Sequence, residues 1–391
     1  MEGSELINRP FLDLHGANEL LTKLYNIQAS NLEELKSFTD QNFYIGLESP
    51  IDIDCGSGDE KCDQFILKLY NSKDSADGNR VELAVNTMAF LSNKEFCCPR
   101  PVRNIYGKLV HLEAISCNDG NGKGFVGKHG VYMVTLLSFL PGQPLGSLNT
   151  LPDEILVDIG KKLAHLHKIL EASLDGFCNE DRNLQRLVKE FQDYNHNKPT
   201  TFCSGEWSLE KVIGQRHLLD LVDDNLLRDA ITKTIDLYEE HVEPICHLFK
   251  KGIIHGDFNE DNIIISKEPI PNQSSKKFIV SGIIDFGEVE YSCLIFDIAV
   301  ALSELVVTYG MSAPRHFLEG YLSKKNIPNT EKNLLYYLVL VRYAQRIMLS
   351  LEAKQRDPLN EYIMKDCETC AGLLRKLLHM EKNDVYTMWN I

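Results

Sequence analysis

Residues 253–289 read IIHGDFNEDNIIISKEPIPNQSSKKFIVSGIIDFGEV, and this stretch decides the fold. Two short apolar, β-branched runs, III and FIVSGII, are flanked by polar turns, a pattern that predicts a small β-hairpin. Asp257 opens the first turn, Asn262 closes it, and Asp285 follows the second apolar run. The stretch therefore carries an Asp-x4-Asn motif and an Asp-Phe-Gly motif at the ends of predicted strands.

These two motifs supply the residue types that phosphoryl transfer from a nucleotide requires. Little covalent work falls to the protein in this reaction, so catalysis is mostly positioning and neutralising charge. A carboxylate has to accept or orient the proton of the attacking hydroxyl, which is the role we assign to Asp257. Mg²⁺ prefers hard oxygen ligands, which suits Asn262 and Asp285. An ordinary polar hairpin is the alternative, since Asp, Asn and Gly all favour turns.

The order His255-Gly256-Asp257, then Asn262, then Asp285-Phe286-Gly287 resembles the aminoglycoside phosphotransferase and choline kinase superfamily of small-molecule kinases. His255 is expected to brace the catalytic turn by hydrogen bonding. Within this superfamily, several phrases resemble the hydroxylysine kinases: SFTDQNFYI, FILKLYNSK, LLSFLPGQPL, IIHGDFNEDNIII and VSGIIDFGEVEY. The likeness runs from about Leu20 to Met380, which is nearly the whole chain.

The resemblance implies an α+β fold of the two-lobed protein-kinase type. A small β-rich lobe that binds the nucleotide is expected over 1–140, and a larger, mainly helical lobe that holds the catalytic and substrate-binding residues over 141–391. Periodicity predicts strands at 32–38, 43–48 and 131–140, and helices at 17–28, 152–172, 225–251, 293–309, 312–323, 331–354 and 358–379. The acidic segment 49–63 is expected to be a loop, and the glycine-rich segment 120–124 a hairpin loop.

Lys68 stands alone in the apolar run FILKL, where a buried charge needs a partner. Glu82 opens the next helical pattern and is the predicted partner, since a strand lysine paired with a helix glutamate holds the α- and β-phosphates in kinases. An edge-strand lysine that points to water is the alternative.

Further nucleotide contacts are implied by the resemblance alone. The first predicted turn would fold over the phosphates, with Ser37, Thr39, Gln41 and Asn42 as candidates, although a plain hairpin turn remains open. The end of the strand at 131–140 would be the hinge between the lobes. Backbone groups of Ser138 and Leu140 are where a purine base would bind there.

An acceptor with ammonium groups needs carboxylates or aromatic faces close to the phosphoryl site. Glu288, Asp297, Glu304 and Trp207 are the candidates, and Arg342 or Arg346 would bind a carboxylate on the acceptor. Solvated charges on helix surfaces are the alternative for each of them.

Composition and net charge limit the classes of binding partner that we expect. The chain has 391 residues with 43% hydrophobic composition, which is ample for a large core, and a formal net charge of −15. This charge argues against a nucleic-acid partner and is compatible with a cationic small molecule. We recognise no leader and no apolar run long enough for a membrane span, and we expect the eleven cysteines to be reduced thiols. A cytoplasmic protein without a membrane partner is predicted.

The predicted activity is transfer of the γ-phosphoryl group of a nucleoside triphosphate, with Mg²⁺, to an alcohol on a small amine. The resemblance implies 5-hydroxy-L-lysine as acceptor and GTP, or else ATP, as donor. Another acceptor such as choline, ethanolamine, homoserine or an aminoglycoside stays open, and so does an inactive nucleotide-binding pseudokinase. No Ala-Pro-Glu segment follows Asp-Phe-Gly, which favours a small acceptor over a protein.

Overall fold

The chain divides into two compact units, Met1–Leu140 and Pro141–Ile391. Within the part of the chain that is described, no helix is long and apolar enough to cross a membrane. The computed structural model describes residues 9–37, 39–54, 59–118, 124–148, 150–174, 205–269, 276–356, 358 and 361–391.

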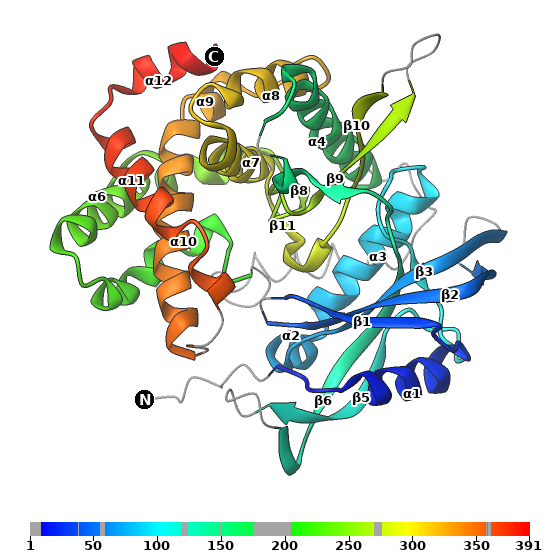
Figure 1. The fold of residues 1–391 in the computed structure, drawn as a ribbon. Coiled ribbons are helices and arrows are strands. Elements are labelled where there is room, and N and C mark those ends of the chain that lie inside the picture. The colour runs from blue at the N-terminus through cyan, green and yellow to red at the C-terminus, as the bar shows by residue number, and fades with distance from the viewer. Residues whose placement is uncertain are drawn as a thin grey trace. The chain divides into compact units, whose positions relative to one another are not determined.

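The first unit is built on a six-stranded antiparallel sheet in the order β1-β2-β3-β6-β4, with β5 also paired to β6. One helix precedes the sheet and two follow β3 (Figure 1). The elements are α1 (Leu14–Tyr25), β1 (Asn31–Leu35), β2 (Gln41–Asp54), β3 (Asp59–Leu69), α2 (Ser72–Asp77), α3 (Asn79–Asn93), β4 (Pro101–Val102), β5 (His111–Asn118) and β6 (Gly124–Ser138).

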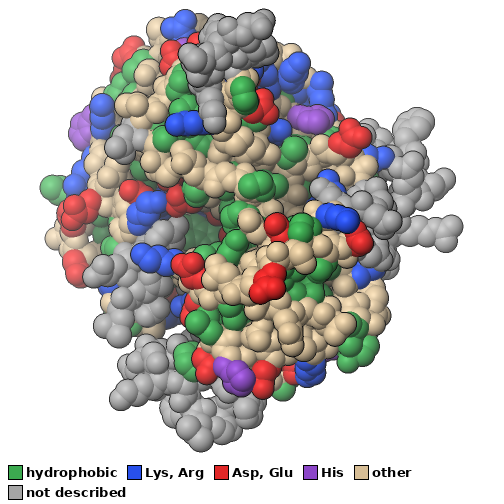
Figure 2. Space-filling view, turned by 45° about the vertical axis from the view of Figure 1, so that its right-hand side comes forward, with side chains coloured by type: hydrophobic (Ala, Val, Ile, Leu, Met, Phe, Trp, Pro, Cys, Tyr) green, Lys and Arg blue, Asp and Glu red, His purple; other side chains and the backbone are tan. Residues whose placement is uncertain are grey.

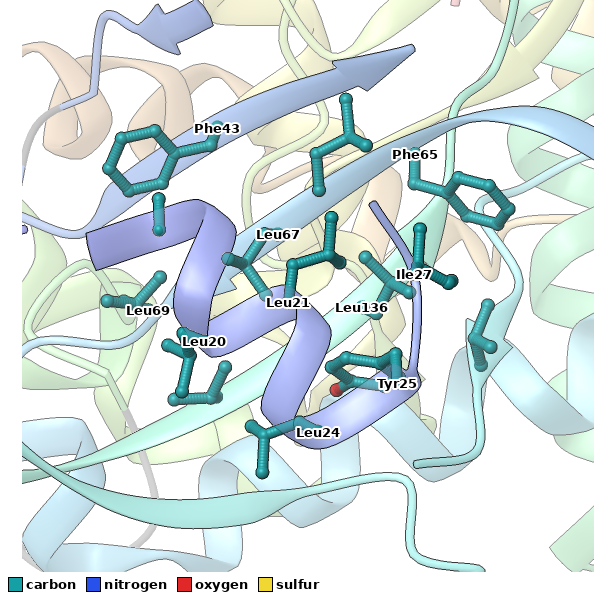
Figure 3. Packing of buried hydrophobic residues seen from close by; sticks show 14 of the residues in the cluster. Leu20, Leu21, Leu24, Tyr25, Ile27, Phe43, Phe65, Leu67, Leu69 and Leu136 are labelled. Atoms are coloured by element: carbon teal, nitrogen blue, oxygen red, sulfur yellow. The ribbon is translucent and has the colours of Figure 1, made fainter. Parts of the chain in front are cut away.

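The core of this unit lies between α1 and the sheet, as Figure 3 shows. Each buried leucine of such a cluster contributes about 1.5–3 kcal/mol. The helix predicted at 17–28 is confirmed, and it begins earlier because Asp13 caps it by accepting a hydrogen bond from the backbone N–H of Gly16 at 2.8 Å. The residues labelled in the figure are Leu20, Leu21, Leu24, Tyr25, Ile27, Phe43, Phe65, Leu67, Leu69 and Leu136.

The acidic segment 49–63 is not the loop that its composition suggested. Strand β2 continues to Asp54 and β3 starts at Asp59, with Ile51 paired to Cys62. Alternating apolar residues extend the hairpin after a register shift between Gly46 and Ile51, and periodicity outweighs the local charge. Residues 55–58, and the proposed hairpin loop at 120–123, lie outside the described residues.

The second unit contains two small sheets, ordered β10-β9-β7 and β11-β8, and a set of helices. The predicted hairpin is confirmed as β9 and β10, with Val280 opposite Ile265 and Ile283 opposite Ile263. The elements are β7 (Gln143–Pro144), α4 (Asp153–Leu174), α6 (Asn225–His241), β8 (Lys251–Ile254), β9 (Ile263–Pro269), β10 (Lys276–Ile283), β11 (Glu290–Cys293), α7 (Leu294–Tyr309), α8 (Ala313–Leu322), α9 (Asn329–Lys332), α10 (Leu335–Arg356), α11 (Cys367–Leu378) and α12 (Lys382–Trp389). Short 3₁₀ helices connect them: η1 (Leu145–Ser147), η2 (Leu209–Lys211), η3 (Ile213–Leu221), η4 (Glu243–Leu248), η5 (Phe286–Glu288) and η6 (Glu361–Met364).

Helix α10 packs against α6, α7 and α11, and α4 packs along α8 (Figure 1). The long helix predicted at 225–251 is wrong, because α6 ends at His241 and a 3₁₀ helix follows. Pro244 lacks the N–H that a continuing α-helix needs. In the view of Figure 2, acidic and basic side chains are interspersed over the face of the molecule that is shown.

Candidate functional site

The turn between β8 and β9 holds Asp257 and Asn262 together. The Nδ2 atom of Asn262 donates to the backbone oxygen of Asp257 at 2.9 Å and to its Oδ2 at 3.0 Å. The side chain of Asn259 shapes the turn by accepting from the backbone N–H groups of Asp261 and Asn262. The Nδ2 atom of Asn262 is thus engaged by Asp257. The Oδ1 atom of Asn262 has no hydrogen bond within the described residues.

His255 braces this turn, as the sequence predicted. Its Nε2 lies 3.0 Å from the backbone oxygen of Ile284, and the backbone N–H of Asp257 donates to its Nδ1 at 3.3 Å. These two partners assign a neutral imidazole with its proton on Nε2. The ring is fully buried and packs against Phe258 and Phe286. A general-base role for His255 is excluded by this geometry, since both ring nitrogens are used.

Only glycine fits between His255 and Asp257. Gly256 has φ +79°, and a Cβ at this position would collide with the backbone oxygen of Glu288. The left-handed conformation and the close approach both require the missing side chain.

Asp297 of α7 binds the backbone of the turn between β8 and β9. Its Oδ2 accepts from the backbone N–H of His255 and its Oδ1 from that of Gly256, both at 2.8 Å. The Nε2 of His167 lies 3.1 Å from Oδ2, and Tyr321 is 2.8 Å from Nδ1 of the same ring. Burial alone would raise the pKa of Asp297, but the hydrogen bond and charge of His167, together with the backbone hydrogen bond from His255, lower it.

The structure thus gives Asp297 a different role from the acceptor contact that the sequence suggested. Its side chain has no exposed surface, and both oxygens are occupied by backbone amides. Two turns of helix separate Asp297 from Glu304, but Glu304 is turned to the arginines of α10. The two carboxylates therefore do not line one open groove.

Asp285 follows β10 in the left-handed region, with φ 57° and ψ 73°. Its side chain accepts a long hydrogen bond from the backbone N–H of Gly287 at 3.4 Å, and the residue is exposed. A backbone hydrogen bond from Ile284 to Asn262, at 2.9 Å, ties this segment to the catalytic turn. Glu288 is half-buried at the end of η5.

A chain of ion pairs runs from Asp257 into the helices. Nη2 of Arg342 lies 3.2 Å from Oδ1 of Asp257, and Nε of Arg342 lies 3.9 Å from Oε1 of Glu304. Arg346 pairs with Oε2 of Glu304 and, at 3.4 Å, with Asp366. Burial alone would lower the pKa of Arg346, but the charge of Glu304 raises it.

Trp207 lies against the guanidinium of Arg342, with its ring centroid 5.0 Å from Cζ. Nη1 of Arg342 also donates to the backbone oxygen of Trp207 at 3.4 Å. Three of the acceptor-site candidates, Trp207, Glu304 and Arg342, are therefore neighbours beside Asp257.

Glu260, on the turn between β8 and β9, extends this ionic cluster. It is 6% exposed, and burial, reinforced by the nearby charge of Glu304, raises its pKa to about 7. Nζ of Lys365 is 3.9 Å away from its Oε1. The sequence analysis missed this residue, because nothing in its local pattern separates it from an ordinary solvated turn residue.

In the first unit, Lys68 of β3 is 8% exposed, and its Nζ lies 3.2 Å from Oδ2 of Asp40. Asp40 is itself held by Asn71, whose backbone N and Nδ2 donate to Oδ1 at 2.9 and 3.0 Å. Glu82 lies in the first turn of α3. The Lys68–Glu82 pair stays a prediction, and Asp40 is a partner that the sequence analysis missed, although it lies inside the turn that was singled out.

The other candidates in that turn have structural contacts of their own. The side-chain amide of Gln41 is buried and bonds both backbone groups of Leu12 at 2.9 Å. Thr39 accepts from Asn71, and Ser37 donates to the backbone oxygen of Asp40. Asn42 has a buried Oδ1 without a hydrogen bond in the described structure. Side-chain contacts to a nucleotide from Gln41 would require breaking its present bonds.

At the end of β6, the backbone N–H of Ser138 donates to the oxygen of Arg100 at 2.8 Å, and its Oγ accepts from the N–H of Arg100 at 2.8 Å. The N–H of Ser138 is thus engaged within the unit. Leu140 is the last residue of the unit and is half-buried. A base contact at these two positions remains a prediction.

Comparison with known proteins identifies relatives of this chain. Over 387 residues the chain is 29% identical to hydroxylysine kinase of Xenopus laevis, which covers 98% of this chain and 94% of the relative. It is 25% identical over 385 residues to hydroxylysine kinase of Danio rerio, covering 98% and 96%.

Solved structures share the fold. An amicoumacin kinase in complex with AMP-PNP and Ca²⁺ matches with a TM-score of 0.60 at 14% identity, covering 96% of this chain and 97% of that one. A microcompartment-associated aminopropanol kinase matches with a TM-score of 0.56 at 16% identity, covering 94% and 98%. The expected kinase-like α+β fold is confirmed. The sequence profile of the phosphotransferase enzyme family matches residues 56–332, so the chain belongs to that family and is a phosphotransferase that acts on an alcohol.

Proposed function

We propose that the protein transfers the γ-phosphoryl group of GTP or ATP to the hydroxyl of 5-hydroxy-L-lysine. The observation that carries the proposal is the Asp257–Asn262 pair. The side-chain nitrogen of Asn262 binds the carboxylate of Asp257, and the side-chain oxygen of Asn262 stays available. The hydroxylysine kinases of Xenopus laevis and Danio rerio, which align over almost the whole chain, support the acceptor.

Asp257 acts as the base. The hydroxyl of the acceptor donates to its carboxylate, the oxygen attacks the γ-phosphorus, the bond to the β-phosphate oxygen breaks, and the proton passes to Asp257. Asn262 fixes Oδ2 and Arg342 fixes Oδ1, so the carboxylate is oriented before the acceptor arrives. The nucleoside diphosphate is the leaving group.

Asn262 and Asp285 have side chains that suit a Mg²⁺ ion, which usually accompanies the nucleotide in this family. Asn262 offers an amide oxygen that is turned away from Asp257, and Asp285 offers a carboxylate at the end of β10. Hard oxygen donors of this kind, one carboxylate and one amide, are what Mg²⁺ takes beside phosphate and water. When bound, the ion would neutralise charge on the phosphates.

In the first unit, Lys68 is the proposed phosphate ligand. Its side chain is nearly buried, and its ammonium lies 3.2 Å from Oδ2 of Asp40. Glu82 remains proposed as a further part of the nucleotide site, together with Ser37, Thr39, Gln41, Asn42, Ser138 and Leu140.

The test is a coupled assay of nucleoside diphosphate release with Mg²⁺, comparing GTP with ATP. The acceptors are hydroxylysine, lysine, choline, ethanolamine and homoserine. We expect turnover with hydroxylysine and none with lysine, because lysine has no hydroxyl. Turnover with choline or ethanolamine and silence with hydroxylysine would replace the proposed acceptor.

A further inference from the structure

Among the described residues near the turn between β8 and β9, two buried side-chain atoms of opposite chemistry lack hydrogen bonds. One is Nε of Arg342, a donor, and the other is Oε2 of Glu260, an acceptor. The two side chains are 4% and 7% exposed. Native structures rarely leave such groups unpaired, so each of these two atoms requires an explanation, and a bound polar ligand supplies one for both.

The other nitrogens of Arg342 are engaged. Nη2 lies on Asp257 and Nη1 on the backbone oxygen of Trp207, at 3.2 and 3.4 Å. Nε faces Oε1 of Glu304 at 3.9 Å, which is too long for a hydrogen bond. Glu304 in turn is bound by Arg346 through its other oxygen. Arg342 therefore offers a donor, in a fixed orientation, beside Asp257.

Glu260 is held in place by its own turn and by the 3₁₀ helix η1. Its backbone oxygen accepts from the N–H of Gly146 at 3.0 Å, and a Cβ on Gly146 would lie 2.8 Å from Cγ of Glu260. Lys365 is 3.9 Å away from Oε1 but lies closer to Asp261, at 2.8 Å. Glu260 shares its turn with Asp257, which Arg342 contacts at 3.2 Å, and Lys365 directly precedes Asp366, which lies 3.4 Å from Arg346. Oε2 of Glu260 is therefore a buried acceptor without a hydrogen bond among the described residues, and an ammonium group would supply the donor.

We propose, resting on the function proposed above, that Arg342 and Glu260 bind the α-amino acid head group of the acceptor. The carboxylate of the head group accepts from Nε of Arg342, and its ammonium donates to Oε2 of Glu260. An ammonium and a carboxylate on one carbon meet both unpaired atoms around Glu304, whereas a simple amino alcohol meets only the acidic one. Arg342 also touches Asp257, so the head group binds next to the base and a short aliphatic chain can return the hydroxyl to Asp257.

The first arm of the test compares hydroxylysine with its decarboxylated analogue, 1,5-diaminopentan-2-ol. In the wild type we expect kcat/KM to favour hydroxylysine by about ten- to a hundredfold, the usual value of a charge-assisted hydrogen bond. In Arg342→Met the preference should fall to about one. A general loss from the disturbed Asp257 cancels, because it affects both acceptors equally.

Arg346→Met is the matched control, since Arg346 lies one turn further along α10 and has both of its contacts on Glu304 and Asp366. The preference for hydroxylysine should persist in this variant. A wild type that turns over both acceptors equally well, or an Arg342→Met protein that keeps the full preference, would overturn the proposal.

The second arm addresses Glu260 with Nα-acetylhydroxylysine, which lacks the α-ammonium. The wild type should disfavour this compound, and Glu260→Gln should lose most of that discrimination while retaining bound nucleotide as evidence of folding. Unchanged discrimination in Glu260→Gln would remove Glu260 from the site.

Calorimetry with lysine and cadaverine separates this inference from the proposed reaction. Lysine carries the head group without the hydroxyl, and cadaverine is its decarboxylated counterpart. No turnover of hydroxylysine together with selective binding of lysine would reject the reaction and keep the head-group site. Lack of any preference for lysine over cadaverine would reject the head-group site, whether or not hydroxylysine is phosphorylated.

Discussion

Nε2 of His167 lies 3.1 Å from Oδ2 of Asp297, and both side chains are completely buried. The pair joins α4 to α7 and, through the two backbone amides that Asp297 binds, to the catalytic turn. The position of Asp257 therefore depends on two side chains that have no exposed surface.

Replacing Asp297 with Asn should destabilise the protein and impair turnover. An asparagine has one acceptor oxygen for two backbone amides, so its NH₂ group would face one of them. We expect a loss of about 2–4 kcal/mol in the free energy of unfolding, measured with urea. Tyr321→Phe, which removes only the hydroxyl next to His167, should cost less.

The carboxylate of Asp297 also makes the free energy of unfolding depend on pH. Its pKa in the folded protein is lowered, so its contribution is fully present above the unfolded value, near pH 4, and is lost as the pH falls through the folded value. The stability difference between wild type and Asp297→Asn should therefore shrink as the pH falls below about 4. A difference that stays constant from pH 6 to acid, measured at about one-unit steps, would argue that Asp297 is protonated in the fold.

Gly256→Ala should disrupt the catalytic turn, because the new Cβ meets the backbone oxygen of Glu288. Gly107→Ala is a matched control: Gly107 has φ +73°, but a Cβ there has no atom within 4 Å. The control should cost about 1–2 kcal/mol from the left-handed conformation alone. Gly256→Ala should cost more and lower kcat, as urea unfolding and steady-state kinetics would report. Equal effects of the two changes would mean that the turn moves aside easily.

Asp40→Asn should tighten the binding of the nucleotide. The change removes a negative charge 3.2 Å from the lysine that we assign to the phosphates, and keeps an oxygen for Asn71. A gain of about 1 kcal/mol, or roughly fivefold in Kd, is expected. Lys68→Met should weaken binding, and titration calorimetry with a nucleotide analogue measures both. Weaker binding by Asp40→Asn would show instead that Asp40 positions Lys68 for the phosphates.

Asp257→Ala and Asp285→Ala should fail in different ways. Loss of the base should lower kcat by about 10²–10⁴-fold while the affinity for nucleotide is kept. Loss of Asp285 should raise the Mg²⁺ concentration needed for half-maximal activity and weaken the binding of the Mg²⁺–nucleotide complex. Full activity in Asp257→Ala would remove it as the base, and an unchanged Mg²⁺ dependence in Asp285→Ala would remove it as a metal ligand.

Local patterns predicted the elements that carry the motifs. The apolar runs before and after the polar turns became β9 and β10, and the apolar periodicity of 293–309 became α7, since each pattern is set by near neighbours in the chain. Errors arose where one residue decided the outcome, as with Pro244, or where alternation was hidden by charge, as in 49–63.

The sequence by itself determined the order of Asp257, Asn262 and Asp285 and, through the resemblance that these motifs carry, the fold class and the family. The tertiary structure alone decided which charges meet: Asp297 with His255 and Gly256, and Arg342 with Asp257, whose positions in the chain are 85 residues apart. Such pairs depend on how α7 and α10 pack, and helix periodicity indicates which face is buried but not which distant charge it faces. A polar residue in a helix therefore has the same sequence pattern whether it is solvated, stabilises a loop or binds a substrate.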